Sequence, residues 1–591
     1  MIRVTAALAA LLLTACATAP EAGEISYVAD QATSRTISSG QLVGYVASGE
    51  GALGAKAPDA KAHVWRSVPF AKPPVGDLRW RAPRAPEPWT GVRSSLTPAP
   101  WCPQVLSALD GVDKSKIGQI VGQEDCLYLD VYAPPMTAQE AADAKLPVMM
   151  WIHGGSNTWG RAEQYDGAAL AARHKVVVVV VQYRLGPLGW LAQEQLRAGA
   201  ETTDDASANF GNLDHIRALE WIRQDIAAFG GDPGRVTVFG ESAGGHNVAA
   251  LLASPRAAGL FHRAIVQSGS FRSTPLAEAE GLTGSSKDSG NAAAARIVGA
   301  GQAVTGAALR AASMKAVFAA YDTSRAGYNP PRVIADGVVL PAAGLSSGLD
   351  SPAAFNAVPV ITGSNRDEMK LFNALDPKLA TFILGVFPQA KDKPLYEAMS
   401  AYPSRLWRAD AVDGPAGRMT AGGHAPVWTY RFDWDEEGSL LITDLGQLLG
   451  AAHSMEIPFV FGHFKLLGRF DPLAFTKGNA PGRLALSDTM MSYWANFAAT
   501  GAPGRGTDGT LAEWKAWTNV PAAPALMVFD SPAGGGARMI PGGETPEKVI
   551  TDLMADPSLK TDARRCEVLM RSTRERLELR KLAGGRCGKP D

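Results

Sequence analysis

The sequence has no excess of charge of either sign. Its 57 basic and 58 acidic residues leave a formal net charge of -1. A nucleic-acid-binding protein is typically basic, so the composition does not favour that class. Hydrophobic residues make up 46% of the chain, which is enough for a sizeable core. By length alone, 591 residues suggest about four domains, but large α/β folds with insertions hold such lengths as one catalytic unit.

A long apolar run is also missing at the N-terminus. The run at residues 6–13 is too short to span a bilayer. It follows a basic start with Arg3 and ends in Leu-Thr-Ala-Cys at residues 13–16. This pattern resembles a bacterial lipoprotein signal, in which Cys16 becomes the acylated first residue, with an ordinary secretory signal as the alternative. We therefore expect an exported protein held at a membrane only through a lipid on Cys16, otherwise a periplasmic or secreted one.

Cysteine is scarce, with five residues in the whole chain. Without Cys16 an even number remains, which in an exported chain favours disulfides. Cys566 and Cys587 are ambiguous, because a continuous helix expected over residues 567–582 would hold them about 7 Å beyond what the intervening chain can close. The two cysteines pair only if that helix is shorter or broken, and the sequence leaves both outcomes open.

The most informative motif is F-G-E-S-A-G-G at residues 239–245. It follows a β-branched run at 236–238 and precedes a helix-forming stretch at 244–253. A G-x-S-x-G turn between a strand and a helix is a nucleophile elbow, which presents one serine hydroxyl, here Ser242, above a sheet edge. The pattern predicts acyl transfer.

A second G-x-S-x-G match occurs at residues 344–348. It lacks both the preceding strand and the following helix, and it runs into Asp350-Ser351-Pro352. We interpret it as a surface turn that carries no catalytic serine.

A second catalytic element is predicted upstream of the elbow. The apolar run 146–152 is typical of a buried strand, and it ends in His-Gly-Gly-Ser at 153–156. Such a turn can direct backbone N–H groups at a developing oxyanion, each worth about 3 kcal/mol.

Taken together, the motifs resemble those of the type-B carboxylesterases, the cholinesterase-like branch of the α/β-hydrolases. The resemblance runs from about residue 40 to about residue 530. It rests on residues 124–132, 151–156, 182–186, 212–214, 218–222, 239–245, 266–270, 430–433 and 493–497.

The resemblance implies a triad of Ser242, Glu368 and His453. Glu368 takes the acid position in G-S-N-R-D-E at 363–368, next to Asp367, and its alternative is a place in a solvated charge cluster. Chain order requires the base to follow the acid, which leaves His424, His453 and His463.

Of these three histidines, His453 lies in the stretch that resembles the family's base loop. His424 precedes an expected strand, and His463 is interpreted as a surface or packing residue. His246, one turn past the nucleophile, is interpreted as packed beneath the elbow.

The resemblance also implies three oxyanion donors, the amides of Gly155, Ser156 and Ala243. Ser156 replaces the third glycine that the family usually carries, so its hydroxyl can touch substrate. Cys102 and Cys126 match the family's first disulfide, and closing a loop of that size stabilises by roughly 3 kcal/mol.

The implied fold is an α/β-hydrolase, with a doubly wound and mostly parallel sheet and helical insertions over the active site. The β-branched run 176–181 and the helical pattern 213–229 agree with it. The expected segments are a signal at 1–16, a linker at 17–39, a catalytic domain at 40–545 and a C-terminal helical segment at 546–591. Helical patches in 273–328 are expected to help cover the site.

The sequence therefore predicts an exported hydrolase of carboxylic esters that needs no metal or cofactor. An enzyme for a specialised natural-product ester, lactone or amide remains an alternative, and a catalytically silent binding module is a weaker one. The particular ester and the oligomeric state are not determined by the sequence.

Overall fold

The computed structural model describes residues 27–48, 60–107, 114–283, 288–321, 333–383, 387–440, 443–573 and 577–587. The expected signal sequence with Cys16 lies outside the described residues. Regular elements begin at η1 (Gln31–Thr33) and β1 (Arg35–Ile37), within the segment 17–39 that the sequence suggested as a linker.

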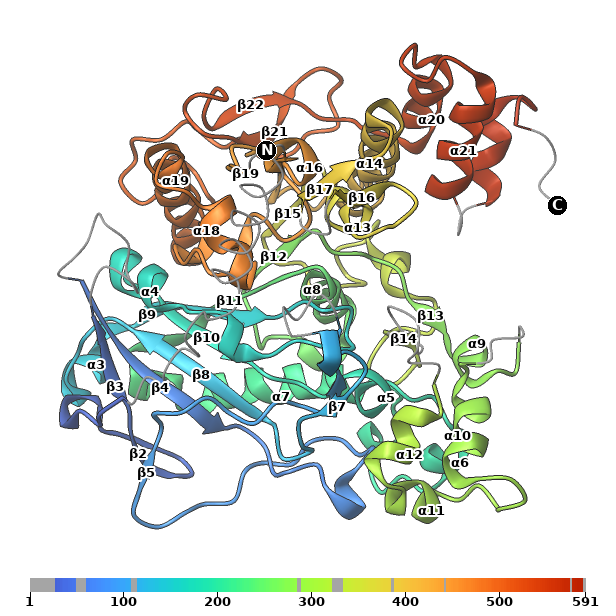
Figure 1. Ribbon diagram of the computed structural model, residues 1–591. Helices are drawn as coiled ribbons and strands as arrows, with labels where there is room; N and C mark the ends of the chain where they lie inside the picture. The colour runs from blue at the N-terminus through green and yellow to red at the C-terminus, as the bar shows by residue number, and fades with distance from the viewer. Residues whose placement is uncertain are drawn as a thin grey trace, which may run out of the picture.

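An eleven-stranded mixed sheet forms the centre of the molecule, in the order β22-β21-β18-β15-β12-β11-β9-β10-β8-β4-β3 (Figure 1). The run from β21 to β10 is parallel, while the strands outside it pair antiparallel. The bounds are β3 (Tyr45–Ser48), β4 (Lys61–Pro69), β8 (Tyr128–Ala133), β9 (Leu146–Ile152), β10 (Val177–Val181), β11 (Gly231–Glu241), β12 (Arg263–Gln267), β15 (Val360–Asn365), β18 (Val427–Phe432), β21 (Pro524–Phe529) and β22 (Arg538–Pro541). The mostly parallel sheet predicted from the sequence is thus present.

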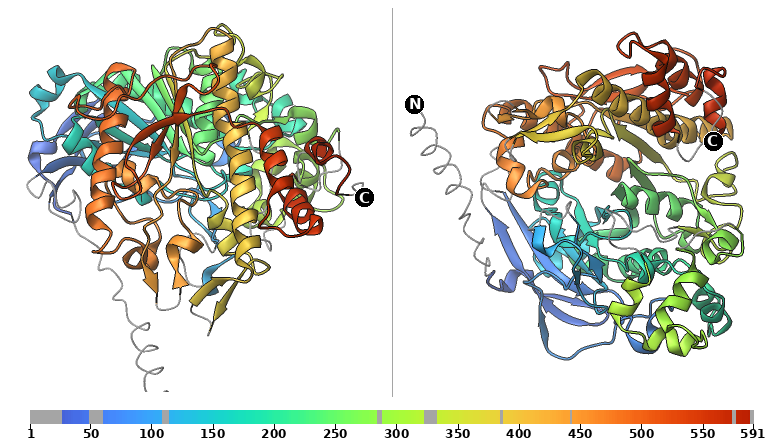
Figure 2. Two further views of the ribbon diagram at one scale, coloured as in Figure 1. Left: turned by 90° about the horizontal axis from the view of Figure 1, so that it is seen from above. Right: turned by 45° about the vertical axis from the view of Figure 1, so that its right-hand side comes forward.

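The sheet separates two hydrophobic cores, because alternate side chains of a strand point to opposite faces. On β9, Val148 and Met150 enter one core, and Met149 and Trp151 enter the other. Helices α7 (Phe210–Asp225) and α8 (Ala243–Ala253) cover the first face, and α4 (Ala168–His174), α17 (Ile457–Phe461) and α19 (Ala480–Thr500) cover the second. Figure 2 shows helices on both sides of the sheet.

The middle region folds into short helices that pack against one another at one end of the molecule (Figure 1). They are α9 (Leu276–Glu280), α10 (Gly290–Val298), α11 (Gly306–Ala311) and α12 (Met314–Ala319). The helical patches expected in 273–328 are confirmed, and their role in covering the active site remains a prediction.

The continuous helix expected over residues 567–582 is wrong. Helix α21 (Asp562–Ser572) ends early, and a separate turn, η12 (Leu577–Ala583), follows. The helix ends at Ser572 and Thr573, two residues that favour a helix interior less than straight-chain residues do, and their hydroxyls donate to the carbonyls of Val568 and Leu569. The break lets the chain return, so that Cys566 and Cys587 form a disulfide.

The C-terminal helices pack on α14 (Lys393–Arg408), beside which they lie in Figure 1. Helices α14, α20 (Pro546–Ala555) and α21 enclose a third hydrophobic core, to which α14 contributes Tyr396, Met399 and Leu406. The same helix is tied to the C-terminal segment by Arg405, which pairs with Glu544 at 3.0 Å. The C-terminal segment therefore holds α14 in place by apolar packing and an ion pair.

Candidate active site

Ser242 lies at a sharp turn between β11 and α8, as the elbow motif predicted. Its backbone has φ 57° and ψ -119°, a conformation that costs energy for a residue with a side chain. The turn is held by the Ser242 N–H, which donates to the Gln267 carbonyl at the end of β12 over 2.9 Å. A Cβ on Gly244 would lie 1.9 Å from the Ile152 carbonyl oxygen, so only glycine lets the elbow sit on the end of β9.

The turn after β9 approaches the elbow closely. An added Cβ on Gly154 would lie 3.3 Å from the Cβ of Ser242. The next residues are left-handed, with φ 97° at Gly155, 56° at Ser156 and 58° at Asn157. Ser156, which stands where the family usually carries a third glycine, is exposed. Ala243 is the first residue of α8, where an N–H has no acceptor within the helix.

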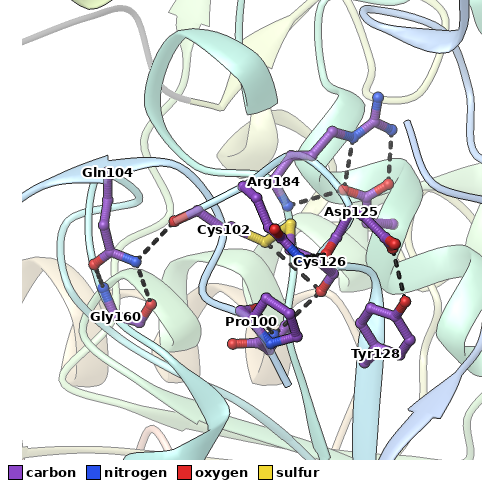
Figure 3. Close-up of a disulfide and its surroundings, with 11 residues drawn as sticks. Pro100, Cys102, Gln104, Asp125, Cys126, Tyr128, Gly160 and Arg184 are labelled. Carbon is purple, nitrogen blue, oxygen red and sulfur yellow. Dashed lines mark hydrogen bonds and ion pairs between the residues drawn. A yellow bond between two sulfur atoms is a disulfide. The ribbon is translucent and has the colours of Figure 1, made fainter. Parts of the chain in front are cut away.

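Gly160, just beyond the turn after β9, is held by hydrogen bonds beside a disulfide (Figure 3). Cys102 and Cys126 are bonded, as the resemblance implied. Two residues beyond Cys102, the buried Gln104 amide donates to the Gly160 carbonyl at 3.1 Å and accepts from its N–H at 2.9 Å. The same amide nitrogen donates to the Cys102 carbonyl at 3.0 Å. The disulfide is therefore linked through one side chain to the loop that carries the predicted oxyanion donors.

Glu368, rather than Asp367, contacts His453. The His453 Nδ1 lies 2.5 Å from Glu368 Oε2, and Glu368 is fully buried. The other carboxylate oxygen accepts from the Ser268 hydroxyl at 2.6 Å and from the Asn365 N–H at 2.7 Å. Asp367 instead pairs with Arg366 at 2.8 Å. Glu368 is therefore not part of a solvated charge cluster, and even the neighbouring Asp367 is buried, at 7% exposure.

The second nitrogen of His453 faces another carboxylate that the sequence analysis did not single out. Nε2 lies 3.2 Å from Glu241 Oε1, and the same oxygen accepts from the Ser454 hydroxyl at 2.7 Å. Within the described part of the chain, no hydrogen bond joins the Ser242 hydroxyl to His453. Glu241 could have been found from its position immediately before the nucleophile in the elbow motif.

Burial and charge oppose each other at this histidine. Burial lowers the pKa of His453, but the carboxylates of Glu241 and Glu368 outweigh that effect and raise the pKa to about 9. For Glu241, burial is the largest effect and raises the pKa to about 8, partly offset by His453. The two groups titrate as a coupled pair, in which a charged Glu241 favours the protonated imidazole and the protonated imidazole favours a charged Glu241.

A network of buried polar groups lies around the Glu368 carboxylate that contacts His453. Glu456 accepts from the Gln267 amide at 3.2 Å and from the Asn365 amide at 2.6 Å. Gln267 in turn accepts from the Trp494 indole at 3.0 Å, and burial raises the pKa of Glu456 to about 7. Several motifs on which the resemblance rests therefore meet here, although they are far apart in the sequence.

Two aromatic rings flank His453, and sequence reasoning missed both. Trp407, on α14, lies 5.0 Å from the imidazole centroid, and Phe372, on α13 (Lys370–Ala374), lies 5.3 Å from it. Both are half-buried, and the Trp407 indole donates to the Gly269 carbonyl at 3.1 Å. No motif in the sequence marks Trp407, because only the packing of α14 brings it to the histidine.

The other histidines are placed away from the base position. His424 Nε2 lies 2.8 Å from the Val358 carbonyl oxygen, while His463 is half-buried. His246 is not packed beneath the elbow as expected, since it is half-buried with Nε2 2.5 Å from the Arg272 carbonyl oxygen. In the turn with the second G-x-S-x-G match, Ser346 is exposed, which confirms the prediction of a surface turn.

The described ranges contain no group of three or more His, Cys, Asp or Glu side chains arranged to hold a metal ion. What the arrangement offers is a serine on a strained elbow, a histidine on a buried carboxylate and a glycine turn close to the serine. These are the parts that acyl transfer requires.

Comparison with known proteins agrees with this chemistry. The model of the Carboxylesterase family matches residues 31–383 and 389–531. The para-nitrobenzyl esterase of Bacillus subtilis (strain 168) is 35% identical over 477 residues, covering 75% of this chain and 87% of that protein. The liver carboxylesterase of Sus scrofa is 35% identical over 500 residues, covering 74% and 81%.

Solved structures give the same result. A PNB esterase structure aligns with a TM-score of 0.63 at 29% identity and covers 86% of this chain and 97% of its own. A carboxylesterase of Geobacillus stearothermophilus aligns with a TM-score of 0.60 at 28% identity, covering 86% and 98%. The chain therefore belongs to the carboxylesterase family, has the α/β-hydrolase fold and is a carboxylic ester hydrolase.

Proposed function

We propose that this protein is an exported serine esterase that works through an acyl-enzyme, with Ser242 as nucleophile, His453 as base and Glu368 as acid. The observation that carries the proposal is the 2.5 Å contact between His453 Nδ1 and Glu368 Oε2. A carboxylate on Nδ1 holds the tautomer in which Nε2 can accept a proton from a serine.

The reaction would proceed in two halves. Ser242 attacks the ester carbonyl while His453 Nε2 takes the hydroxyl proton, and Glu368 stabilises the imidazolium. The amides of Gly155, Ser156 and Ala243 hold the oxyanion until the alcohol leaves with the proton from His453. A water activated by His453 then releases the acid from Ser242.

Substrate binding must also change the partner of Nε2. In the structure this nitrogen faces Glu241, the residue next to Ser242 in the elbow. Catalytic contacts often tighten only when substrate is bound, so we infer that Nε2 exchanges Glu241 for the serine hydroxyl at that step.

The substrates are proposed to be carboxylic esters with an apolar group that lies against Trp407 and Phe372. Both rings are half-buried beside His453 and offer an apolar surface next to the reacting atoms. Because one relative is named para-nitrobenzyl esterase, para-nitrobenzyl and para-nitrophenyl esters of increasing acyl length are suitable first probes.

The decisive experiment compares Ser242→Ala with Ser346→Ala. Loss of the nucleophile should lower ester hydrolysis by on the order of 10⁴ or more without changing the melting temperature. The Ser346 variant, altered in the other G-x-S-x-G match, should keep full activity. Mass spectrometry after reaction with a slowly hydrolysed ester should find the acyl group on the peptide that contains Ser242. Equal losses in both variants, or an acyl group elsewhere, would exclude the proposed nucleophile.

Export is proposed from the N-terminal pattern and is supported by the two disulfides, which persist in oxidising compartments. Among the described residues, no helix has the length and apolar character needed to cross a bilayer. The lipid anchor at Cys16 is part of this proposal.

A further inference from the structure

The oxyanion turn and the nucleophile helix are joined by a row of buried side-chain amides. Asn247, five residues after Ser242 on α8, donates from Nδ2 to the Asn157 Oδ1 at 2.8 Å. Its own Oδ1 accepts from the Asn212 Nδ2 at 3.2 Å, and Asn212 Oδ1 accepts from the Trp190 indole at 3.0 Å. All four side chains are at most 1% exposed.

The row of amides ends at Asn157, which has a left-handed backbone conformation. Asn157 has φ 58° and follows Ser156 at φ 56°, so two successive residues with side chains adopt the left-handed conformation. Asparagine tolerates this region better than most residues, but serine does so less readily. In the described part of the chain Asn157 Nδ2 has no hydrogen-bond partner, so the position of this side chain depends on the Asn247 amide that donates to its Oδ1.

The Tyr183 hydroxyl lies close to both ends of the turn, and its one proton is directed to the nearer acceptor, the His153 carbonyl. This hydroxyl lies 2.7 Å from the His153 carbonyl oxygen, before the glycines, and 3.4 Å from Asn157 Oδ1, after them. Burial lowers the pKa of His153 to about 4, so the ring that stacks on Tyr183 at 4.4 Å is neutral. Tyr183 thus fixes the start of the His153–Asn157 turn, while Asn247 fixes its end relative to Ser242.

We propose that Asn247 is a positioning residue for ester hydrolysis, which acts through Asn157 to hold the oxyanion donors in register with Ser242. This inference rests on the proposed nucleophile and oxyanion hole. Donor positions matter most in the transition state, because the oxyanion exists only there and in the tetrahedral intermediates. Loss of the contact is therefore expected to lower kcat and leave KM nearly unchanged.

The test compares Asn247→Ala with Asn356→Ala. Asn356 is a matched control, because its amide donates to the carbonyls of Leu251 and Ser254 at the other end of the same helix. For Asn247→Ala we expect kcat to fall by about tenfold to 10²-fold, since a 1 Å misplacement of a catalytic group can cost about 10²-fold. The affinity for an aryl boronic acid, which forms a tetrahedral adduct on the serine, should fall by a similar factor. Asn356→Ala should lower the melting temperature with kcat unchanged.

Asn157→Gly provides a second variant, in which helix α8 is left unchanged. Glycine adopts φ 58° without strain, so the protein should fold, but it lacks the amide that Asn247 holds. It should show the same fall in kcat, and adding Asn247→Ala to it should cause little further loss. Multiplied losses in the double variant, or unchanged kcat and boronate affinity in both single variants, would overturn the inference.

The two proposals fail in distinguishable ways. If the parent enzyme were insensitive to the boronic acid, or Ser242→Ala kept its activity, the proposed nucleophile would be wrong and this inference would fall with it. If the parent behaved as proposed and the asparagine variants matched Asn356→Ala, only the positioning role would be wrong.

Discussion

His453 is placed between two buried carboxylates, and its two nitrogens have different partners. Nδ1 contacts Glu368, which receives two further hydrogen bonds, whereas Nε2 faces Glu241 on the elbow. Because the acid is fully satisfied and excluded from water, it can hold the imidazole in one orientation. Asp367 is adjacent in sequence, but it pairs with Arg366 and faces another environment.

Glu368→Gln is expected to lower turnover by orders of magnitude, because the orienting carboxylate is lost and the wrong tautomer of His453 is favoured. Asp367→Asn is the matched control at the neighbouring position, and we expect it to have a smaller effect. Steady-state kinetics on a chromogenic ester measures both. If Asp367→Asn proved the more damaging change, the acid would have to be reassigned.

The pH dependence should report the charge around His453. The base must be neutral, so activity is lost as the pH falls through its pKa. That pKa is raised to about 9, so the acid limb of kcat/KM should lie above the ordinary histidine value of about 6.5. Glu241→Gln removes one of the three carboxylates that raise the pKa of His453, and the limb should move to lower pH. Profiles from about pH 5 to pH 10 would contradict this if the parent limb lay at or below about 6.5 or did not move in the variant.

At the scale of elements, the site is assembled where several loops meet at the ends of parallel strands. The elbow follows β11, the turn with the proposed oxyanion donors follows β9, the proposed acid Glu368 follows β15, and Ser268 follows β12. Parallel strands end at one edge, so short loops after them bring distant residues together. The turn after β9 has further supports, with Tyr183 at His153 where it begins, Asn247 at Asn157 where it ends, and Gln104 at Gly160 beyond it.

The two disulfides provide an element-scale prediction. Replacing Cys102 and Cys126 together by serine should lower the free energy of unfolding by about 3 kcal/mol. It should also reduce kcat, because the backbone next to Gln104 is then no longer anchored by the disulfide. The matched control replaces Cys566 and Cys587, which close a loop of similar length, 21 against 24 residues apart. This control should lose similar stability with little change in kcat. Denaturant unfolding and steady-state kinetics measure the two effects, and equal kinetic losses in both pairs would contradict the link through Gln104.

At the scale of the whole molecule, the folded domain determines the chemistry, and the N-terminal pattern bears on the location of the protein. The sheet, its two cores and the loops at its edge account for the chemistry. The expected acylation of Cys16 would account for location alone, since that cysteine lies far in sequence from every residue of the site.

Cys16→Ser is therefore expected to release the enzyme from membranes, in a soluble or unprocessed form, with unchanged kcat on a soluble ester. Fractionation of cells that express the parent and the variant, followed by activity assays of each fraction, measures this. Identical fractionation would show that residues 1–16 act as an ordinary signal or an uncleaved leader.

Local patterns in the sequence were sufficient for the main features of fold and chemistry. The apolar run 146–152 coincides with β9, the elbow motif predicted the sharp turn at Ser242, and the mostly parallel sheet followed from the resemblance and from strands such as 176–181. These features depend on the periodicity of hydrophobic residues and on the glycines of turns, and both can be read from the sequence itself.

The tertiary structure decided what depends on contacts between distant segments. It distinguished Glu368 from Asp367, brought Trp407 to His453, joined Asn157 to Asn247 and ended α21 early enough for Cys566 to reach Cys587. No local pattern carries this information, because it arises only when the packing of the two sheet faces sets the position of each helix. The sequence by itself therefore determined which chemistry the protein carries, and the packing determined which side chains hold that chemistry in place.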